Sequence, residues 1–281
     1  MSEVDIAHLR QWIGREQQLS EMLTEGLVER FDATLGNARA KIAEDAPLAI
    51  HWCLTQPTVQ PDELGKDGHP ARGNFLPPVS LPRRMWAGGE LTLLAPLRID
   101  EVVTRSSRIA DVTHKTGRSG DLVFVTVEHQ IISAGRVAVR ERQDIVYRGE
   151  QLTPAQPAKE SVDPRQPEFR ETVKTNTTLL FRYSALTFNG HRIHYDLDYA
   201  REQEGYAGLV VHGPLQATLL LHFAARISGN RTPIQFSYRG VAPLICGDDF
   251  SVNATRNGKN IDLWTAGSDG ATRMTAQAVM A

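Results

Sequence analysis

The feature that most constrains the fold of this chain is a period-two alternation of apolar and polar residues across much of its first half. Short segments with this alternation lie at residues 90–93, 102–109, 122–131 and 137–147, with glycine-containing turn sequences between the later ones. A period of two places alternate side chains on opposite faces of an extended chain, one face toward a core and one toward solvent. The pattern therefore predicts an antiparallel meander.

The same alternation returns near the end of the chain. The predicted strands there are residues 234–239, 249–256, 260–266 and 271–279, and the Asn-Gly pair at 257–258 predicts a hairpin turn between the second and the third. The second half of the sequence therefore also predicts an antiparallel sheet.

Helical spacing of apolar residues marks three further segments. The first helix is predicted over residues 4–18, and the second over 24–35, with Thr24 as its N-cap and Gly36 at its end. A strongly apolar helix is predicted over 214–227, because proline is well tolerated in a first helical turn. Each half thus combines helix with antiparallel sheet, which predicts an α+β layer arrangement.

Two proline-rich stretches divide the chain. Residues 150–168 are polar and contain four prolines, which predicts a linker between a first half, residues 1–149, and a second half, residues 169–281, that opens with a strand. Residues 56–84 are rich in proline, glycine and charge, which predicts a long loop. A loop of this length within a compact domain is usually functional, so we expect it to act at a site or as a lid.

The composition argues against several classes of function. The net charge is −2, from 31 basic and 33 acidic residues, so we expect no binding to nucleic acid or to an anionic membrane surface. No stretch approaches the roughly 18 apolar residues of a membrane-spanning helix, and the charged N-terminus carries no export sequence. Cys53 and Cys246 are far apart in the sequence, which predicts two reduced thiols in a cytoplasmic protein.

A polar cluster at residues 189–196 carries the first chemical signal. It reads Asn-Gly-His-Arg-Ile-His-Tyr-Asp. Histidine exchanges a proton near neutral pH, so His194, with His191 three residues before it, predicts an acid–base group. Asn189 could hold a water or a carbonyl group, because an amide both donates and accepts hydrogen bonds. The alternative is a solvated loop in which Asp196 caps the next helix.

The second signal is His212-Gly213, directly before the apolar helix. A glycine at a helix start exposes its backbone N–H and adds the positive end of the helix dipole. Such a donor could stabilise the enolate that forms when a proton moves next to a thioester carbonyl. The alternative is a plain tight turn. Gly88, which follows Trp86 closely, similarly predicts either close approach of a ligand to the backbone or a β-bulge.

No sequence motif predicts a separate cofactor. The chain contains no Walker A loop, no dinucleotide-binding glycine fingerprint and no HExxH sequence. The spacing of His191 and His194 would suit a metal ion, but no third ligand is evident, so we expect no metal.

Together these motifs resemble the MaoC-like, hydratase-2 family of enoyl-thioester hydratases and dehydratases. His194-Tyr195-Asp196 is similar to the end of that family's D-x-N-P-x-H-x-D motif, and residues 209–215 are similar to its second motif. With the sequence PPVSLPRRMWAGG at residues 77–89, the chain resembles a narrower subgroup. That subgroup includes mitochondrial-type 3-hydroxyacyl-thioester dehydratases, mesaconyl-C4-CoA hydratases and itaconyl-CoA hydratases.

The resemblance implies a double hot dog, in which two antiparallel sheets, each wrapped around a helix, are fused edge to edge in one chain. It also implies reversible hydration of an acyl-CoA substrate, with coenzyme A as part of that substrate, His194 as the catalytic histidine and the Gly213 N–H as oxyanion donor. The first half would shape the acyl tunnel. Hot-dog sheets often pair edge to edge, so we expect a homodimer. The residues expected to contact substrate are Val211, His212, Trp86 and Gly88.

One position departs from the family pattern. Asn189 stands where the family has its catalytic aspartate, and His191 stands where it has an asparagine. Because an amide cannot act as a base, either His194 or His191 moves the proton, or a carboxylate comes from elsewhere in the chain. One alternative is therefore a non-catalytic acyl-CoA-binding protein, and another is a 3-hydroxyacyl-thioester dehydratase of the fatty-acid type.

Basic residues near the polar cluster favour a dicarboxylic acyl group. Arg192 and Arg182 could pair with a distal carboxylate through two parallel hydrogen bonds, as could Arg83 or Arg84 from the long loop. This favours itaconyl-CoA or mesaconyl-C4-CoA as the substrate. The alternatives are salt bridges to nearby aspartates, or contacts with the phosphates of coenzyme A.

Overall fold

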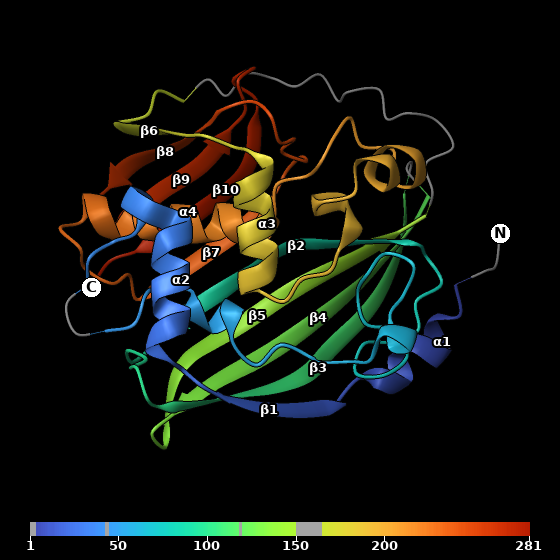
Figure 1. Ribbon diagram of the computed structural model, residues 1–281. Helices are drawn as coiled ribbons and strands as arrows, with labels where there is room; N and C mark the ends of the chain where they lie inside the picture. Colours follow the sequence, from blue (N-terminus) through green and yellow to red (C-terminus); the bar gives the residue numbers. More distant parts are fainter. Residues whose placement is uncertain (1–3, 43–44, 118–119, 150–164) are drawn as a thin grey trace.

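The computed structural model describes residues 4–42, 45–117, 120–149 and 165–281 (Figure 1). These residues form one ten-stranded sheet in which neighbouring strands are antiparallel, and the predicted strands of both halves are present. The strands are β1 (Glu16–Met22), β2 (Arg83–Leu93), β3 (Val102–Gly117), β4 (Gly120–Ser133), β5 (Arg136–Arg148), β6 (Phe169–Val173), β7 (Gln235–Gly240), β8 (Phe250–Asn257), β9 (Asn260–Ala266) and β10 (Thr272–Val279).

The two halves of the sheet repeat one topology. The first-half strands stand in the order β1-β3-β4-β5-β2 and the second-half strands in the order β6-β8-β9-β10-β7, so each strand has a counterpart five numbers later. The halves join where β2 pairs with β7, from Gly88 opposite Arg239 to Thr92 opposite Gln235. The sheet is therefore continuous across the junction.

Glycines allow the strands at this junction to come close together. The register of β2 shifts between Trp86 and Gly88, which marks a β-bulge. A Cβ atom on Gly89 would lie 2.3 Å from the Arg142 carbonyl oxygen and from the Tyr238 hydroxyl oxygen, so no larger residue fits there. Gly88 is buried within this junction and does not line the cavity described below. Of the two alternatives for Gly88, the structure adopts the bulge.

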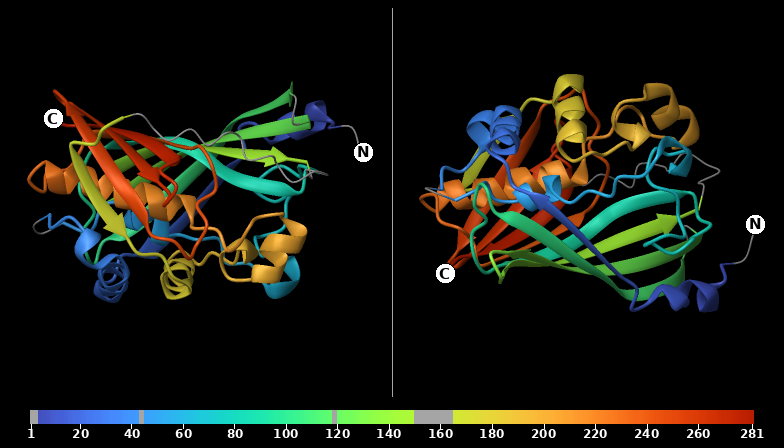
Figure 2. Two further views of the ribbon diagram at one scale, coloured as in Figure 1. Left: turned by 90° about the horizontal axis from the view of Figure 1, so that it is seen from above. Right: turned by 60° about the horizontal axis from the view of Figure 1, so that its bottom comes forward.

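The second half wraps around one long helix, α4 (Gly213–Ile227), which packs against β8, β9 and β10. Every residue from Leu215 to Ala225 is buried, as expected for a helix that is apolar on all sides. The predicted helix that ends at Gly36 is confirmed as α2 (Glu25–Leu35). It lies beside α3 (Thr177–Leu186), its counterpart in the second half (Figures 1 and 2).

In the first half, a short 3-10 turn, η3 (Ile50–Cys53), occupies the place that α4 has in the second. The indole N–H of Trp52 donates to Glu141 Oε1 on β5 at 2.8 Å, and Arg105 on β3 donates to the carbonyl of Thr55. These bonds hold the turn against the inner face of the sheet. The first sheet therefore encloses η3 and the loop after it instead of a long helix, which leaves room for a cavity.

Two segments differ from the sequence prediction. Residues 4–18 form only α1 (Ile6–Leu9) and the 3-10 turn η1 (Arg10–Trp12), because Gly14, with a φ of 87°, redirects the chain into β1. The second difference is α3, which the apolar pattern does not predict. Asn176 caps that helix by accepting a hydrogen bond from the Leu179 N–H at 2.8 Å. Asn176, directly before the helix, is the residue from which the start of α3 could have been predicted, because asparagine is a favoured N-cap.

Residues 56–82 form the predicted long loop, which contains one 3-10 turn, η4 (Pro61–Glu63). Most of the predicted linker, residues 150–164, lies outside the described residues. Within the described ranges, no helix has the length and apolar character needed to cross a membrane.

Candidate active site

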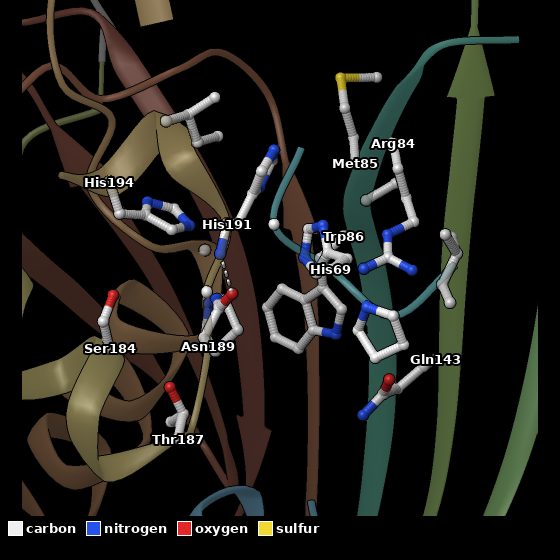
Figure 3. A pocket seen from close by; sticks show the side chains of 18 of the residues that line it. His69, Arg84, Met85, Trp86, Gln143, Ser184, Thr187, Asn189, His191 and His194 are labelled. Atoms are coloured by element: carbon white, nitrogen blue, oxygen red, sulfur yellow. Dashed lines mark hydrogen bonds between the residues drawn. The ribbon is translucent and has the colours of Figure 1, made fainter. Parts of the chain in front are cut away.

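A cavity of about 1460 Å³ lies between the two halves. Its walls come from the inner face of the first-half sheet, the loop of residues 56–82, the end of α3 and the start of α4. Figure 3 shows the histidines of the polar cluster on one side of this space and β2, with Trp86, on the other. All four positions predicted to be catalytic line it, namely Asn189, His191, His194 and Gly213.

A tight turn holds the polar cluster in place. The chain turns after α3 at Phe188, with a φ of 46°, and the Asn189 N–H donates to the Ser184 carbonyl at 2.8 Å. The side-chain Oδ1 of Asn189 accepts a hydrogen bond from the His191 N–H at 2.9 Å. This bond fixes the amide so that its Nδ2 remains available to donate. The chain then continues as the 3-10 turn η5 (Arg192–His194).

His194 is held as a neutral imidazole. Its Nδ1 lies 2.7 Å from the Val210 carbonyl oxygen, which can only accept, so Nδ1 carries the proton and Nε2 has a free lone pair. Burial lowers the pKa of His194 to about 3, and the nearby imidazole of His191 contributes to the decrease. At neutral pH His194 is therefore a hydrogen-bond acceptor.

His212 supports His194 from behind. The two rings are stacked, with centroids 3.6 Å apart and planes 18° apart. His212 Nε2 lies 2.8 Å from the Ser184 hydroxyl oxygen, and burial holds the pKa of His212 well below its usual value. The ring is fully buried and does not line the cavity. His212 is therefore placed to orient His194, which corrects the prediction that it contacts substrate.

Gly213 places a backbone donor at the cavity wall. As the first residue of α4, its N–H has no partner within the helix, and Pro214 contributes no N–H of its own. A Cβ atom on Gly213 would lie 3.0 Å from Cε3 of Trp86, so the indole packs directly on this position. Trp86, Val211 and Gly213 all line the cavity, as predicted for these three residues.

The loop of residues 56–82 docks against the polar cluster. Its Asp67 carbonyl accepts the Arg192 N–H at 2.9 Å, and a Cβ atom on Gly68 would lie only 2.0 Å from the Gly190 carbonyl oxygen. The loop thereby brings His69 against His191, with ring centroids 4.3 Å apart.

The side chains of Asp67, His69 and His191 gather within 4.8 Å of one another, a grouping that could hold a metal ion. His69 Nδ1 already pairs with Asp67 Oδ2 at 3.0 Å. Burial, and then the positive charge of Arg84, hold the pKa of His69 well below its usual value. These contacts account for the cluster without a metal ion.

The sequence analysis missed two residues of the site, His69 and Glu204. Glu204 follows the π-helical turn η6 (Tyr199–Gln203), and its Oε1 lies 3.6 Å from His191 Nε2. Among the described residues that line the cavity, Glu204 is the one with a carboxylate. Its sequence context offered no signal, because its neighbours Glu202 and Gln203 are equally polar and are exposed.

Of the arginines predicted to bind substrate, Arg83 and Arg84 line the cavity, whereas Arg192 and Arg182 do not. Arg192 forms a salt bridge to Asp196 at 2.7 Å, which was the alternative considered from the sequence, and Arg182 donates to the Ala33 carbonyl at 3.2 Å. Neither lines the cavity, so both predictions of substrate contact are corrected. The arginines that do line it are Arg72, Arg83, Arg84, Arg105, Arg148 and Arg273.

The chain is similar to proteins of known activity. The family model of hydroxyacyl-thioester dehydratase type 2 matches residues 49–246. Mesaconyl-C(4)-CoA hydratase of Chloroflexus aurantiacus is 43% identical over 267 residues, which cover 94% of this chain and 95% of the relative.

Solved structures share the fold. A MaoC-like dehydratase from Phytophthora capsici has a TM-score of 0.71 at 14% identity, and the match covers 99% of both chains. A Mycobacterium tuberculosis protein with a double hotdog fold has a TM-score of 0.55 at 12% identity, covering 95% of this chain and 96% of that one. These similarities confirm the predicted double hot-dog architecture.

Proposed function

Because the chain belongs to the hydroxyacyl-thioester dehydratase type 2 family, we propose that it adds water reversibly to the double bond of a short dicarboxylic enoyl-CoA. The relative at 43% identity makes mesaconyl-C4-CoA the first substrate to test and itaconyl-CoA the second. One observation carries the proposal. A neutral imidazole, an amide donor and an N–H at a helix start line the same cavity.

Each of these groups meets one demand of hydration. The Gly213 N–H donates to the thioester oxygen, where negative charge develops as water adds. Nε2 of His194 accepts a hydrogen bond from the water, and Nδ2 of Asn189 donates one to the water oxygen. As that oxygen bonds to Cβ, the water gives one proton to an imidazole of the site and the double-bond electrons move onto the thioester as an enolate. Cα then takes up the proton from that imidazole. The reverse sequence eliminates water.

The charge of the cavity supports a dicarboxylic acyl group, because six arginines and one carboxylate line it. Arg84 is close to the histidines, since its charge affects His69, whose ring packs on that of His191. The second carboxylate of a short diacid lies only a few bonds from the thioester carbonyl. Arg84 is therefore our choice for the residue that pairs with it.

The test compares mesaconyl-C4-CoA, itaconyl-CoA and crotonyl-CoA by the loss of enone absorbance, with the wild type, His194→Ala and Arg84→Met. We expect mesaconyl-C4-CoA to have the highest kcat/KM and His194→Ala to lose about 100-fold or more. Arg84→Met should lower turnover of the two diacid thioesters at least about tenfold more than that of crotonyl-CoA. Arg105→Met changes another cavity arginine, on β3, and serves as the control, with its melting temperature measured because Arg105 also donates to the Thr55 carbonyl.

Two outcomes would contradict the proposal. If Arg84→Met lowers the turnover of all three thioesters equally, Arg84 is not the residue that pairs with the second carboxylate of the diacid. Tight binding of all three thioesters without hydration of any would favour the alternative of an acyl-CoA-binding protein.

The size of the cavity favours one further candidate function. About 1460 Å³ exceeds what a short diacid occupies, and the matching family is described as dehydratases of hydroxyacyl thioesters. A dehydratase of longer 3-hydroxyacyl thioesters would show kcat/KM rising with acyl length from four to about ten carbons. A fall over the same series supports the short diacid.

A further inference from the structure

We infer that His191 carries the proton in this reaction, and that Glu204 is the carboxylate that orients His191 and offsets its charge. The inference rests on the proposed hydratase function. Among the described residues that line the cavity, Glu204 is the one with a carboxylate.

Glu204 and His191 form a buried pair. Glu204 Oε1 lies 3.6 Å from His191 Nε2, and each side chain is 6% exposed. Nε2 is buried and has no hydrogen-bond partner at shorter range. A carboxylate is costly to bury unless it faces a group that can carry positive charge. The imidazole of His191 is the group that Glu204 faces.

The backbone holds both members of this pair. The His191 N–H is bound to Asn189 Oδ1 at 2.9 Å. The Glu204 N–H donates to the Tyr199 carbonyl five residues back at 3.2 Å, which is the spacing of a π-helical turn. Such turns are rare and occur frequently at functional sites. The geometry of the pair is therefore set by main-chain bonds on both sides.

Several other charged groups surround His191, and none replaces Glu204. Asp67 is already paired with His69 at 3.0 Å. The nearby cationic groups disfavour the protonated imidazole of His191, and an adjacent carboxylate offsets that effect. The described groups that face this region are His69 and Asp67 from the loop of residues 56–82, Arg83 and Arg84 from β2, His194 from η5, Tyr199 and Tyr206 on either side of Glu204, and His212 before α4.

His194 is poorly suited to store the proton. With a pKa of about 3, roughly one molecule in 10⁴ would hold a proton on this imidazole at neutral pH. Among the residues that the structure describes, the carboxylate of Glu204 lies beside the ring of His191, and no ion pair to the ring of His194 is present. The two histidines therefore have different roles: His194 accepts a hydrogen bond from the water, and His191 exchanges the proton.

The proton step balances without a further reactant. Nε2 of His191 holds its proton toward Glu204, so Nδ1 accepts a proton from the water as the water oxygen bonds to Cβ. The resulting imidazolium is offset by the Glu204 carboxylate. It then gives a proton to Cα of the enolate, which restores the neutral imidazole and leaves the hydrated thioester. The net change is addition of one water molecule across the double bond.

The test compares Glu204→Gln, Glu204→Asp and the wild type on mesaconyl-C4-CoA from pH 5 to 9. We expect Glu204→Gln to lower kcat about 10² to 10³-fold with KM within about threefold, and Glu204→Asp to recover part of the loss. In Glu204→Gln the acid-side fall of kcat should move to lower pH, because an imidazole without an adjacent negative charge is harder to protonate. Glu202→Gln, on the exposed side of η6, is the matched control.

Titration with crotonyl-CoA at low temperature, followed by tryptophan fluorescence, shows whether Glu204→Gln still binds a thioester and is folded. If Glu204→Gln does not fold, the same measurements are made with His191→Gln. A kcat within about threefold of wild type in Glu204→Gln, or a loss with an unchanged pH profile, overturns the inference. If instead the wild type hydrates none of the enoyl-CoA thioesters, the proposed hydratase function itself is refuted. That outcome is distinct from an active wild type with an unaffected Glu204→Gln, which refutes only the role of Glu204.

Discussion

The sharpest physical prediction concerns the buried His222 of α4, which lies in the core rather than in the cavity. His222 Nδ1 accepts the Ala40 N–H at 3.0 Å, and its Nε2 lies 3.0 Å from the Leu48 carbonyl oxygen, to which it donates. Both ring nitrogens are thus used by the neutral form. Burial lowers the pKa of His222 to about 3. We predict that replacement by glutamine makes the stability of the protein less sensitive to acid.

The sign and the size of this effect follow from proton linkage. The folded chain keeps His222 neutral down to a pH of about 3, whereas the unfolded chain binds a proton below about 6.5. The contribution of His222 to the free energy of unfolding is therefore fully present above pH 6.5, and it decreases as the pH falls below 6.5. At pH 5, roughly 1.5 pH units at about 1.36 kcal/mol each give a loss of about 2 kcal/mol from this residue.

The assay is urea unfolding near pH 7.5 and near pH 5, for the wild type, His222→Gln and the exposed control His8→Gln. Between the two pH values the wild type and His8→Gln should lose about 2 kcal/mol more than His222→Gln. The buried His129 and His194 also have lowered pKa values and add to the loss in all three proteins, so only the difference is informative. Equal losses in the wild type and His222→Gln would refute the reasoning.

Three shorter predictions concern the loop, the sheet and the helix start. Gly68→Ala places a Cβ atom 2.0 Å from the Gly190 carbonyl oxygen, at a φ of 85°. The substitution should displace the loop and lower kcat/KM about tenfold or more. An unchanged kcat/KM would show that docking of the loop on the polar cluster is unimportant for activity. Trp52→Phe removes one of two hydrogen bonds to the buried Glu141 Oε1, to which Gln143 still donates at 2.7 Å, and should cost about 1 kcal/mol in urea unfolding. A cost near zero would contradict this. Gly213→Ala keeps the backbone N–H but places a Cβ atom 3.0 Å from Trp86, so it should lower kcat by crowding the position where the thioester oxygen meets that N–H. Full activity would argue against a thioester oxygen bound at this position.

Local chemistry explains which parts of the fold could be predicted from the sequence. The cap at Thr24, the glycine at Gly36 and the Asn-Gly hairpin at 257–258 act within a few residues, so their sequence pattern is sufficient. The helix predicted over residues 4–18 is too long and runs into the start of β1, because its periodic residues pack on a second, smaller core cluster while the chain has already turned at Gly14.

The candidate site was predictable only where its groups are close in the sequence. Asn189, His191 and His194 share one turn, and Gly213 begins a helix whose apolar pattern is plain. His69 reaches His191 from a distant loop, and Glu204 reaches it through a π-helical turn, so no spacing rule predicts either contact. Arg192 could not be assigned from composition, because Asp196 one helical turn later binds its guanidinium.

The repeated strand order has a consequence for how such a chain can diversify. Both halves have the same strand topology, yet the groups of the chemical step come from the segment between α3 and α4, in the second half. The opposite wall comes from inner-face side chains of β3, β4 and β5, such as Ser107, His129 and Gln143, in the first half. Substitutions on that wall can alter which acyl groups enter without moving the reacting groups. In the proposed hydratase, substrate range and reaction type would thus be encoded in separate stretches of one gene.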